Sequence, residues 1–61
     1  MKTENNNSII GFIHWKDGEI TQTTPHASAN EIIDAFEPMK NEISGIEFFN
    51  IKTYEITTKF F

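Results

Sequence analysis

The first extended segment of this sequence, residues 8–15, carries apolar side chains of both parities. Side chains alternate between the two faces of a strand, so Ile10 and Phe12 point to one side. The other side receives a second apolar set, Ile9, Ile13 and Trp15. A strand with one solvated face is expected to alternate apolar and polar residues instead. Both faces of this strand therefore need a cover.

The C-terminal segment, residues 46–61, repeats this pattern. One of its parities holds Ile46, Phe48, Tyr54 and Ile56, and the other holds Phe49 and Ile51. The sequence supplies one amphipathic helical segment, and a single helix covers only one face of a sheet. An uncovered apolar sheet face is therefore predicted, and a second copy of the chain or another protein is expected to bury it.

A β-hairpin is predicted near the N-terminus. Asp17-Gly18 separates the first strand from a second one over Glu19–Thr24, and an Asp-Gly pair between such segments is a strong hairpin signal. Pro25 ends the second strand, because proline cannot donate a hydrogen bond to the sheet.

The register of this hairpin has two solutions. A two-residue turn pairs Trp15 with Ile20, whereas a longer loop that includes Lys16 pairs His14 with Ile20. One residue of slip moves every side chain to the opposite face. The two-residue turn is the preferred prediction.

A helix is predicted from Ala29 to about Glu42. Ser28 and Glu31 have the spacing of a capping box, in which each side chain bonds the backbone amide of the other residue. At ~100° per residue, six apolar residues fall within one arc of about 120°: Ala29, Ile32, Ile33, Phe36, Met39 and Ile43. Pro38 interrupts the segment, so we expect a kinked helix or a helix followed by a short extra turn.

Ser44-Gly45 is predicted to end the helix, and residues 46–61 are predicted to form one long strand because they contain neither glycine nor proline. The alternative is a loop at Asn50-Ile51-Lys52 that divides this segment into two strands. The predicted fold is α+β, with the order ββαβ, a three-stranded antiparallel sheet of order 3-1-2 and one helix packed on one face. The unpaired edge of a long last strand is a template for pairing with another chain.

Chain length and composition predict one small domain over residues 8–61, preceded by a disordered polar tail over residues 1–7. The 61 residues include no cysteine, so neither a disulfide nor a thiolate metal site can supplement the core. A domain of this size buries only about 60% of the surface that its unfolded chain exposes. Self-association is the expected additional source of burial, and a homodimer is predicted.

Nine acidic residues face five lysines in a chain without arginine, which gives a formal net charge of −4. Nucleic-acid binding normally needs a basic surface, and arginine is the preferred residue for phosphate and guanine contacts. Direct nucleic-acid binding is therefore disfavoured. No segment approaches the ~18 apolar residues of a membrane span, and the polar start lacks the apolar core of a signal peptide. A cytoplasmic protein is expected.

Catalysis and cofactor binding are not expected. His14 and His26 are the two histidines, and their spacing matches no metal-binding motif. The chain has no cysteine nucleophile, and its serines are assigned to a tail, a helix cap and a helix end. Its three glycines build no phosphate-binding loop. The sequence therefore predicts a protein that is not an enzyme and that has no catalytic residue, no metal and no cofactor.

Two surfaces are predicted to bind proteins. The uncovered sheet face is assigned Ile13, Trp15, Phe49 and Ile51, since aromatic residues are enriched at interfaces. The helix face opposite the apolar arc carries four carboxylates, Glu31, Asp34, Glu37 and Glu42. Such a row is typical of a solvated helix, and it also suits a partner with a basic surface.

The small size, the acidity and the lack of catalytic groups are what we expect of an accessory regulator or inhibitor of the kind that phages and mobile elements carry. Such a protein would dimerise through its sheet and engage a protein partner. The alternative is a nucleic-acid-binding regulator that uses the strand surface His14-Trp15-Lys16 together with Lys52.

Overall fold

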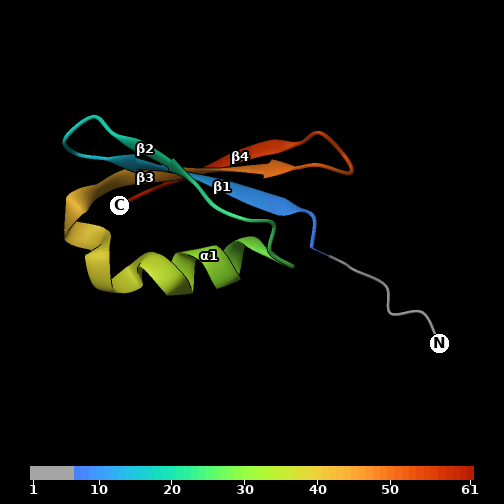
Figure 1. The fold of residues 1–61 in the computed structure, drawn as a ribbon, viewed down its shortest axis with the longest axis horizontal. Coiled ribbons are helices and arrows are strands. Elements are labelled where there is room, and N and C mark those ends of the chain that lie inside the picture. The colour runs from blue at the N-terminus through green and yellow to red at the C-terminus, as the bar shows by residue number, and fades with distance from the viewer. Residues whose placement is uncertain (1–6) are drawn as a thin grey trace.

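The computed structural model describes residues 7–61, which form an antiparallel sheet with a helical segment across one face (Figure 1). The strands are β1 (Ile9–Trp15), β2 (Ile20–Gln22), β3 (Ile43–Asn50) and β4 (Ile56–Phe60). The helices are α1 (Ala29–Phe36) and the 3-10 helix η1 (Glu37–Glu42). This arrangement confirms the α+β class. Apart from Asn7, the predicted tail over residues 1–7 lies outside the described residues.

The sheet has four strands, in the order β2-β1-β3-β4, and not the predicted three. β1 lies between β2 and β3, as predicted, and β4 pairs with the other side of β3. The turn between β3 and β4 begins at Asn50, whose Oδ1 accepts hydrogen bonds from the amides of Lys52 at 2.9 Å and Thr53 at 3.1 Å. Residues 46–61 thus follow the alternative with a loop, and the single long strand is wrong.

The β1–β2 hairpin has the longer of the two possible loops. The amide of Trp15 donates to the carbonyl oxygen of Glu19 at 2.9 Å, and the amide of Gly18 donates to that of Trp15 at 3.0 Å. Gly18 has a φ of 97°, the left-handed conformation that commonly ends a three-residue hairpin loop. His14 therefore pairs with Ile20, and the preferred two-residue turn is wrong.

Pro38 divides the helical segment as the sequence indicates. It lies in the first turn of η1, where its missing amide hydrogen costs least. The prediction of a helix with a short extra turn is confirmed. The predicted capping box is wrong, because the Ser28 side chain makes no cap hydrogen bond. Oε1 of Glu31 lies instead 3.2 Å from Nδ1 of His26.

Ser44 and Gly45 lie inside β3 and do not end the helix, contrary to the prediction. Gly45 is buried and pairs with Phe60 of β4. A Cβ atom at position 45 would lie 2.9 Å from the backbone oxygen of Lys59, closer than Cβ atoms approach. Glycine is therefore needed here so that β4 can pair closely with β3.

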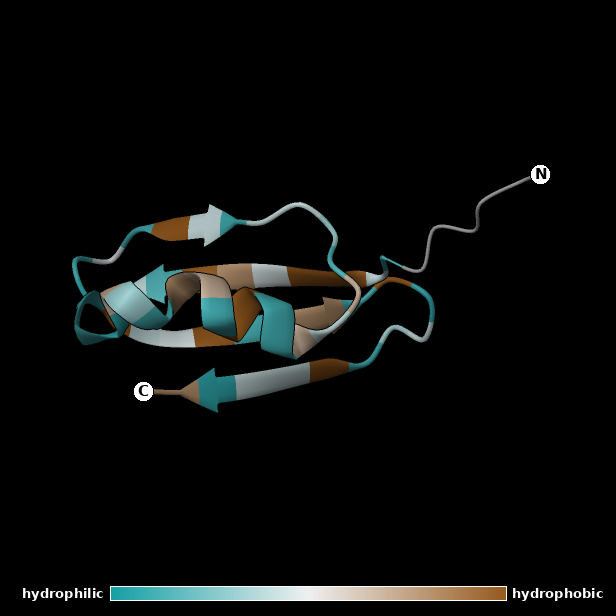
Figure 2. Ribbon diagram, turned by 90° about the horizontal axis from the view of Figure 1, so that it is seen from below, coloured by the Kyte–Doolittle hydropathy of each residue, from teal (hydrophilic) through white to brown (hydrophobic). Residues whose placement is uncertain are grey.

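The core lies between the helical segment and the sheet. Its buried side chains are those of Ile13, Ile32, Ile43, Ile46 and Phe48. The predicted apolar arc faces this core, and its remaining members pack against it: Ala29, Ile33, Phe36 and Met39. In Figure 2, α1 lies over the two central strands, and β2 and β4 flank it. No element of residues 7–61 covers the opposite face of the sheet.

Candidate functional site: the uncovered sheet face

The side of the sheet away from α1 is called the uncovered face here. Directly paired residues share a face, so the strand register assigns eleven positions to it. They are Ile10, Phe12, His14, Ile20, Gln22, Gly45, Glu47, Phe49, Ile56, Thr58 and Phe60. Six of the eleven are large and apolar, whereas a solvated sheet face is normally polar. Three of these side chains are more than half exposed, namely Ile20 (60%), Ile56 (64%) and Phe60 (80%).

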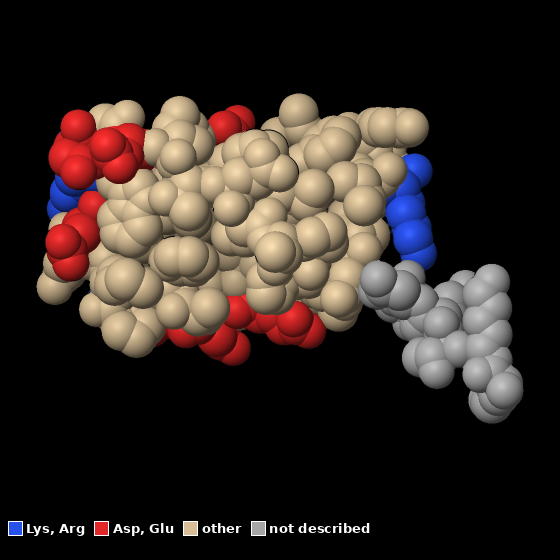
Figure 3. All heavy atoms as spheres, viewed as in Figure 1, with Lys and Arg blue, Asp and Glu red and all other residues tan. Residues whose placement is uncertain are grey.

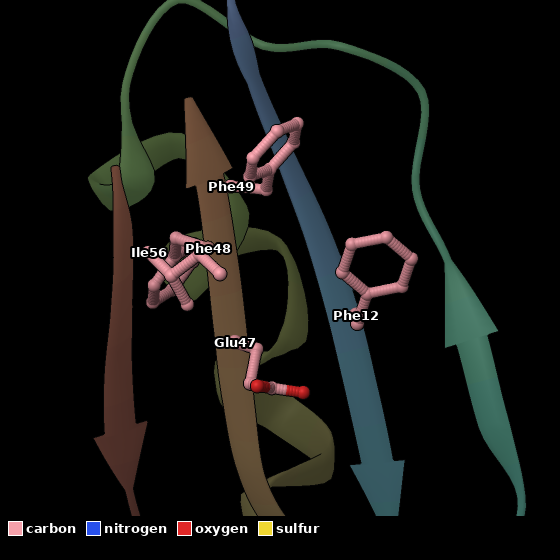
Figure 4. A pocket seen from close by; sticks show the side chains of 5 residues that line it. All are labelled: Phe12, Glu47, Phe48, Phe49 and Ile56. Atoms are coloured by element: carbon pink, nitrogen blue, oxygen red, sulfur yellow. The ribbon is translucent and has the colours of Figure 1, made fainter. Parts of the chain in front are cut away.

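Aromatic side chains lie at the middle of the uncovered face. Phe12 lies opposite Glu47 across the central strands, and Phe49 lies two residues further along β3. Ile56 of β4 lies opposite Phe49. These four residues, together with Phe48, line a shallow open hollow (Figure 4). The hollow is too open for a small-molecule site of the enclosed kind, but it suits apolar side chains of another polypeptide.

One polar pair interrupts the apolar surface. Nε2 of His14 lies 2.7 Å from Oε1 of Glu47, and the two side chains are 38% and 45% exposed. The pair spans β1 and β3 diagonally, since His14 lies directly opposite Gly45. The uncovered face thus carries an imidazole and a carboxylate in contact, with Glu47 in its middle row between Phe12 and Thr58 and His14 in an end row between Ile20 and Gly45.

Three of the four residues predicted for this face lie elsewhere. Ile13 is fully buried beneath the helical segment, and Trp15 packs on that same side. Ile51 lies in the β3–β4 turn, so only Phe49 belongs to the uncovered face. The physical reason is the β1–β3 register, in which Ile13 pairs with Ile46 and both point toward the helix.

Sequence reasoning did not assign Ile10, Phe12, Ile56 and Phe60 to the uncovered face. A signal for this assignment was present in the strands themselves. His14 has the parity of Phe12, and Glu47 has the parity of Phe49. Ionisable side chains are almost never fully buried without a partner, so their parity marks the side of each strand that faces away from the core.

The four predicted carboxylates of the helical segment, Glu31, Asp34, Glu37 and Glu42, are all exposed. Figure 3 shows acidic atoms along the margin formed by α1 and at the end that holds η1 and the β1–β2 turn. Two of the four have a basic neighbour: Glu31 lies beside His26, and Oε1 of Glu37 lies 3.0 Å from Nζ of Lys40. Within residues 7–61, Asp34 and Glu42 form no ion pair. This pair of carboxylates is therefore the open part of the acidic row.

The residues of the alternative nucleic-acid surface do not lie together. His14 points to the uncovered face, Trp15 points to the helical side, and Lys16 lies in the hairpin loop. His14 and His26 also have separate carboxylate neighbours. In the described part of the chain, no group of three histidine or acidic side chains comes close enough to hold a metal ion.

Comparisons with protein-family models, with curated proteins and with solved structures give no match to this chain. Neither α1 nor η1, the helices of the described residues, has the length and apolar character needed to cross a membrane. The uncovered face and the acidic row are the features from which a function can be argued.

Proposed function

We propose that this protein is a non-enzymatic protein-binding module that forms a homodimer by stacking its uncovered face on that of a second copy. In this role it acts as a small accessory regulator or inhibitor and presents its acidic helical segment to a protein partner. The observation that carries the proposal is the uncovered face, in which six of eleven positions are large and apolar.

Burial of apolar side chains supplies the driving force for stacking. Fully burying an isoleucine or phenylalanine side chain contributes about 1.5–3 kcal/mol, and Ile20, Ile56 and Phe60 are each more than half exposed. Two sheets pack face to face at a spacing of ~10 Å, with their side chains interdigitating. Stacking would thus give the small domain the second apolar layer that its own helical segment does not provide.

The polar pair on the uncovered face suits a two-fold axis. An isologous interface brings the same patch of both copies together. An axis near His14 and Glu47 places Glu47 of the second copy beside His14 of the first. It also places Glu47 of the first copy beside His14 of the second. Each side chain then keeps a hydrogen-bonding neighbour in the interface, which buried polar groups require.

The substitution Phe12→Lys tests the proposal. Phe12 is half-buried and lies opposite Glu47, so a lysine there keeps a favourable cross-strand partner within the monomer. Stacking would bury the new ammonium group at the centre of the interface, which is costly. Sedimentation is expected to show the mass of the associated species reduced by half relative to the wild type.

Ala27→Lys is the matched control, because it makes the same charge change at an exposed position in the connector before α1. It is expected to keep the wild-type mass. Circular dichroism should show the same secondary structure in all three proteins. A Phe12→Lys variant with the wild-type mass and fold would contradict stacking through the uncovered face.

The acidic row is tested by charge reversal. The double variant Glu31→Lys with Asp34→Lys is expected to keep the fold and the mass of the wild-type oligomer. In affinity capture from host cells, it should no longer retain the proteins that bind to the wild type. The control is Asp17→Lys with Glu19→Lys in the hairpin, which changes net charge equally at another exposed site. Equal retention by the reversed and wild-type proteins would reject the acidic-row mechanism.

A further inference from the structure

β4 forms an edge of the sheet with backbone groups directed away from it. The amide of Asn50 donates to the backbone oxygen of Glu55 at 2.9 Å, and the amide of Phe61 donates to that of Ser44 at 3.3 Å. In an antiparallel ladder alternate residues bond to the neighbouring strand. Residues 55, 57, 59 and 61 therefore face β3. Residues 56, 58 and 60 direct their amide and carbonyl groups outward.

β4 is the more open of the two sheet edges. All five of its residues are exposed. The other edge, β2, has only three residues, and Pro25 follows it closely. Proteins commonly block an edge with proline, a bulge or inward-pointing charges. β4 has no proline and its pairing with β3 is regular, so the one blocking feature that it carries is Lys59, which lies on the helical side of the strand opposite Ile46.

We propose that β4 is a second self-association surface, separate from the uncovered face, and that it pairs antiparallel with β4 of another copy about Thr58. In this register Thr58 lies opposite its own counterpart, and Ile56 lies opposite Phe60 of the other copy. Each opposed pair exchanges two backbone hydrogen bonds, so the three pairs form about six. The outward groups of residues 56, 58 and 60 are then all used.

The side chains fit this register. On the uncovered side, Ile56 meets Phe60 of the other copy, which is a favourable aromatic and β-branched cross-strand pair. On the helical side, Lys59 lies opposite Thr57 of the other copy and diagonal to its Glu55. Its other diagonal neighbour is Lys59 of the other copy, so each Lys59 gains one acidic and one like-charged neighbour, and no two like charges lie directly opposite each other. The apolar pairs and the outward backbone groups, and not the charges, therefore favour this register.

The edge pairing and the stacking of uncovered faces can occur together. The two-fold axis between paired β4 strands is perpendicular to the sheet, whereas the axis between stacked faces lies parallel to it. Two perpendicular, intersecting two-fold axes generate a closed tetramer. The wild type is therefore expected to form a tetramer of two stacked eight-stranded sheets.

Thr58→Pro and Thr58→Val form a matched pair of tests. The Thr58 amide points away from β3, so proline removes no hydrogen bond of the monomer while it abolishes pairing at the axis. Valine keeps both the amide and the β-branched shape. Sedimentation is expected to show a dimer for Thr58→Pro and a tetramer for Thr58→Val. Phe12→Lys should be a dimer held through β4, and Phe12→Lys combined with Thr58→Pro should be a monomer.

These masses separate the two interfaces. A monomeric, folded Phe12→Lys protein would overturn the β4 pairing while leaving the stacking of the uncovered face intact. A dimeric wild type that becomes monomeric with Thr58→Pro but not with Phe12→Lys would support β4 and reject the face.

Cross-linking tests the register itself. The two Thr58 residues of a hydrogen-bonded pair have Cα atoms about 5.5 Å apart, within the range that a disulfide spans. The chain has no native cysteine, so Thr58→Cys introduces a single thiol. On mild oxidation it is expected to form a linked dimer at least ten times faster than Asn30→Cys on the exposed side of α1. Equal rates would overturn pairing about Thr58.

Discussion

Tyr54 occupies a backbone conformation that tyrosine rarely adopts. Its φ is 64°, and the left-handed region costs a residue with a Cβ atom about 1–2 kcal/mol. Two contacts hold it there. Its amide donates to the backbone oxygen of Asn50 at 2.7 Å, and its ring lies 6.1 Å from that of Phe49, centroid to centroid. The β3–β4 turn thus depends on a residue type that gives no turn signal in the sequence.

A comparison of two single substitutions, Tyr54→Gly and Tyr54→Ala, isolates the free-energy cost of the positive φ at this position. Both Tyr54→Gly and Tyr54→Ala lose the ring contact with Phe49, but only glycine adopts a positive φ freely. Tyr54→Gly is therefore expected to have a free energy of unfolding about 1 kcal/mol higher than Tyr54→Ala, as measured by urea denaturation. At an ordinary strand position alanine is the more stable of the two, so the opposite order would show that the turn is not strained.

At the scale of the element, α1 is attached to the sheet mainly through Ile32. This side chain is fully buried, and its Cγ2 atom lies 3.0 Å from the position of a Cβ atom at Gly11. Ile32→Ala is expected to lower the free energy of unfolding by about 2–5 kcal/mol, because it leaves a cavity between helix and sheet. Ile51→Ala removes the same atoms from a 39% exposed residue. It should cost less than half as much, and equal losses would contradict the assigned core.

The elements differ in how well the sequence predicts them. The helical segment follows from its apolar arc and from Pro38, because both signals are local. The hairpin was predicted, but its loop length was not, since Asp17-Gly18 fits loops of two or three residues and the register moves with that choice. β4 was not predicted as a separate strand because the turn before it has Tyr54 at its positive-φ position, where a glycine would have given a turn signal. Ile13 and Trp15 were assigned to the wrong sheet face because the pairing between β1 and β3 decides which side of each strand faces the helix. That pairing is set by contacts between residues distant in sequence, such as Ile13 with Ile46.

At the scale of the whole molecule, folding and association are thermodynamically linked. A state that associates only when folded is stabilised by mass action. The wild-type melting temperature is therefore expected to rise with protein concentration, as measured by calorimetry over a hundredfold range. The variant that combines Phe12→Lys with Thr58→Pro should show no such dependence. A wild-type melting temperature independent of concentration would contradict both proposed interfaces.

Trp15 gives the molecule a built-in optical reporter. It is the only tryptophan in the chain, its indole donates to Oγ1 of Thr21 at 2.8 Å, and its ring packs edge-on against Phe36. Both contacts lie on the helical side of the sheet, away from the uncovered face and from β4. Its fluorescence emission therefore reports whether each copy is folded, and it does not report whether the copies are associated. Dilution that separates the copies should leave the emission spectrum unchanged, whereas denaturant should shift it to the red.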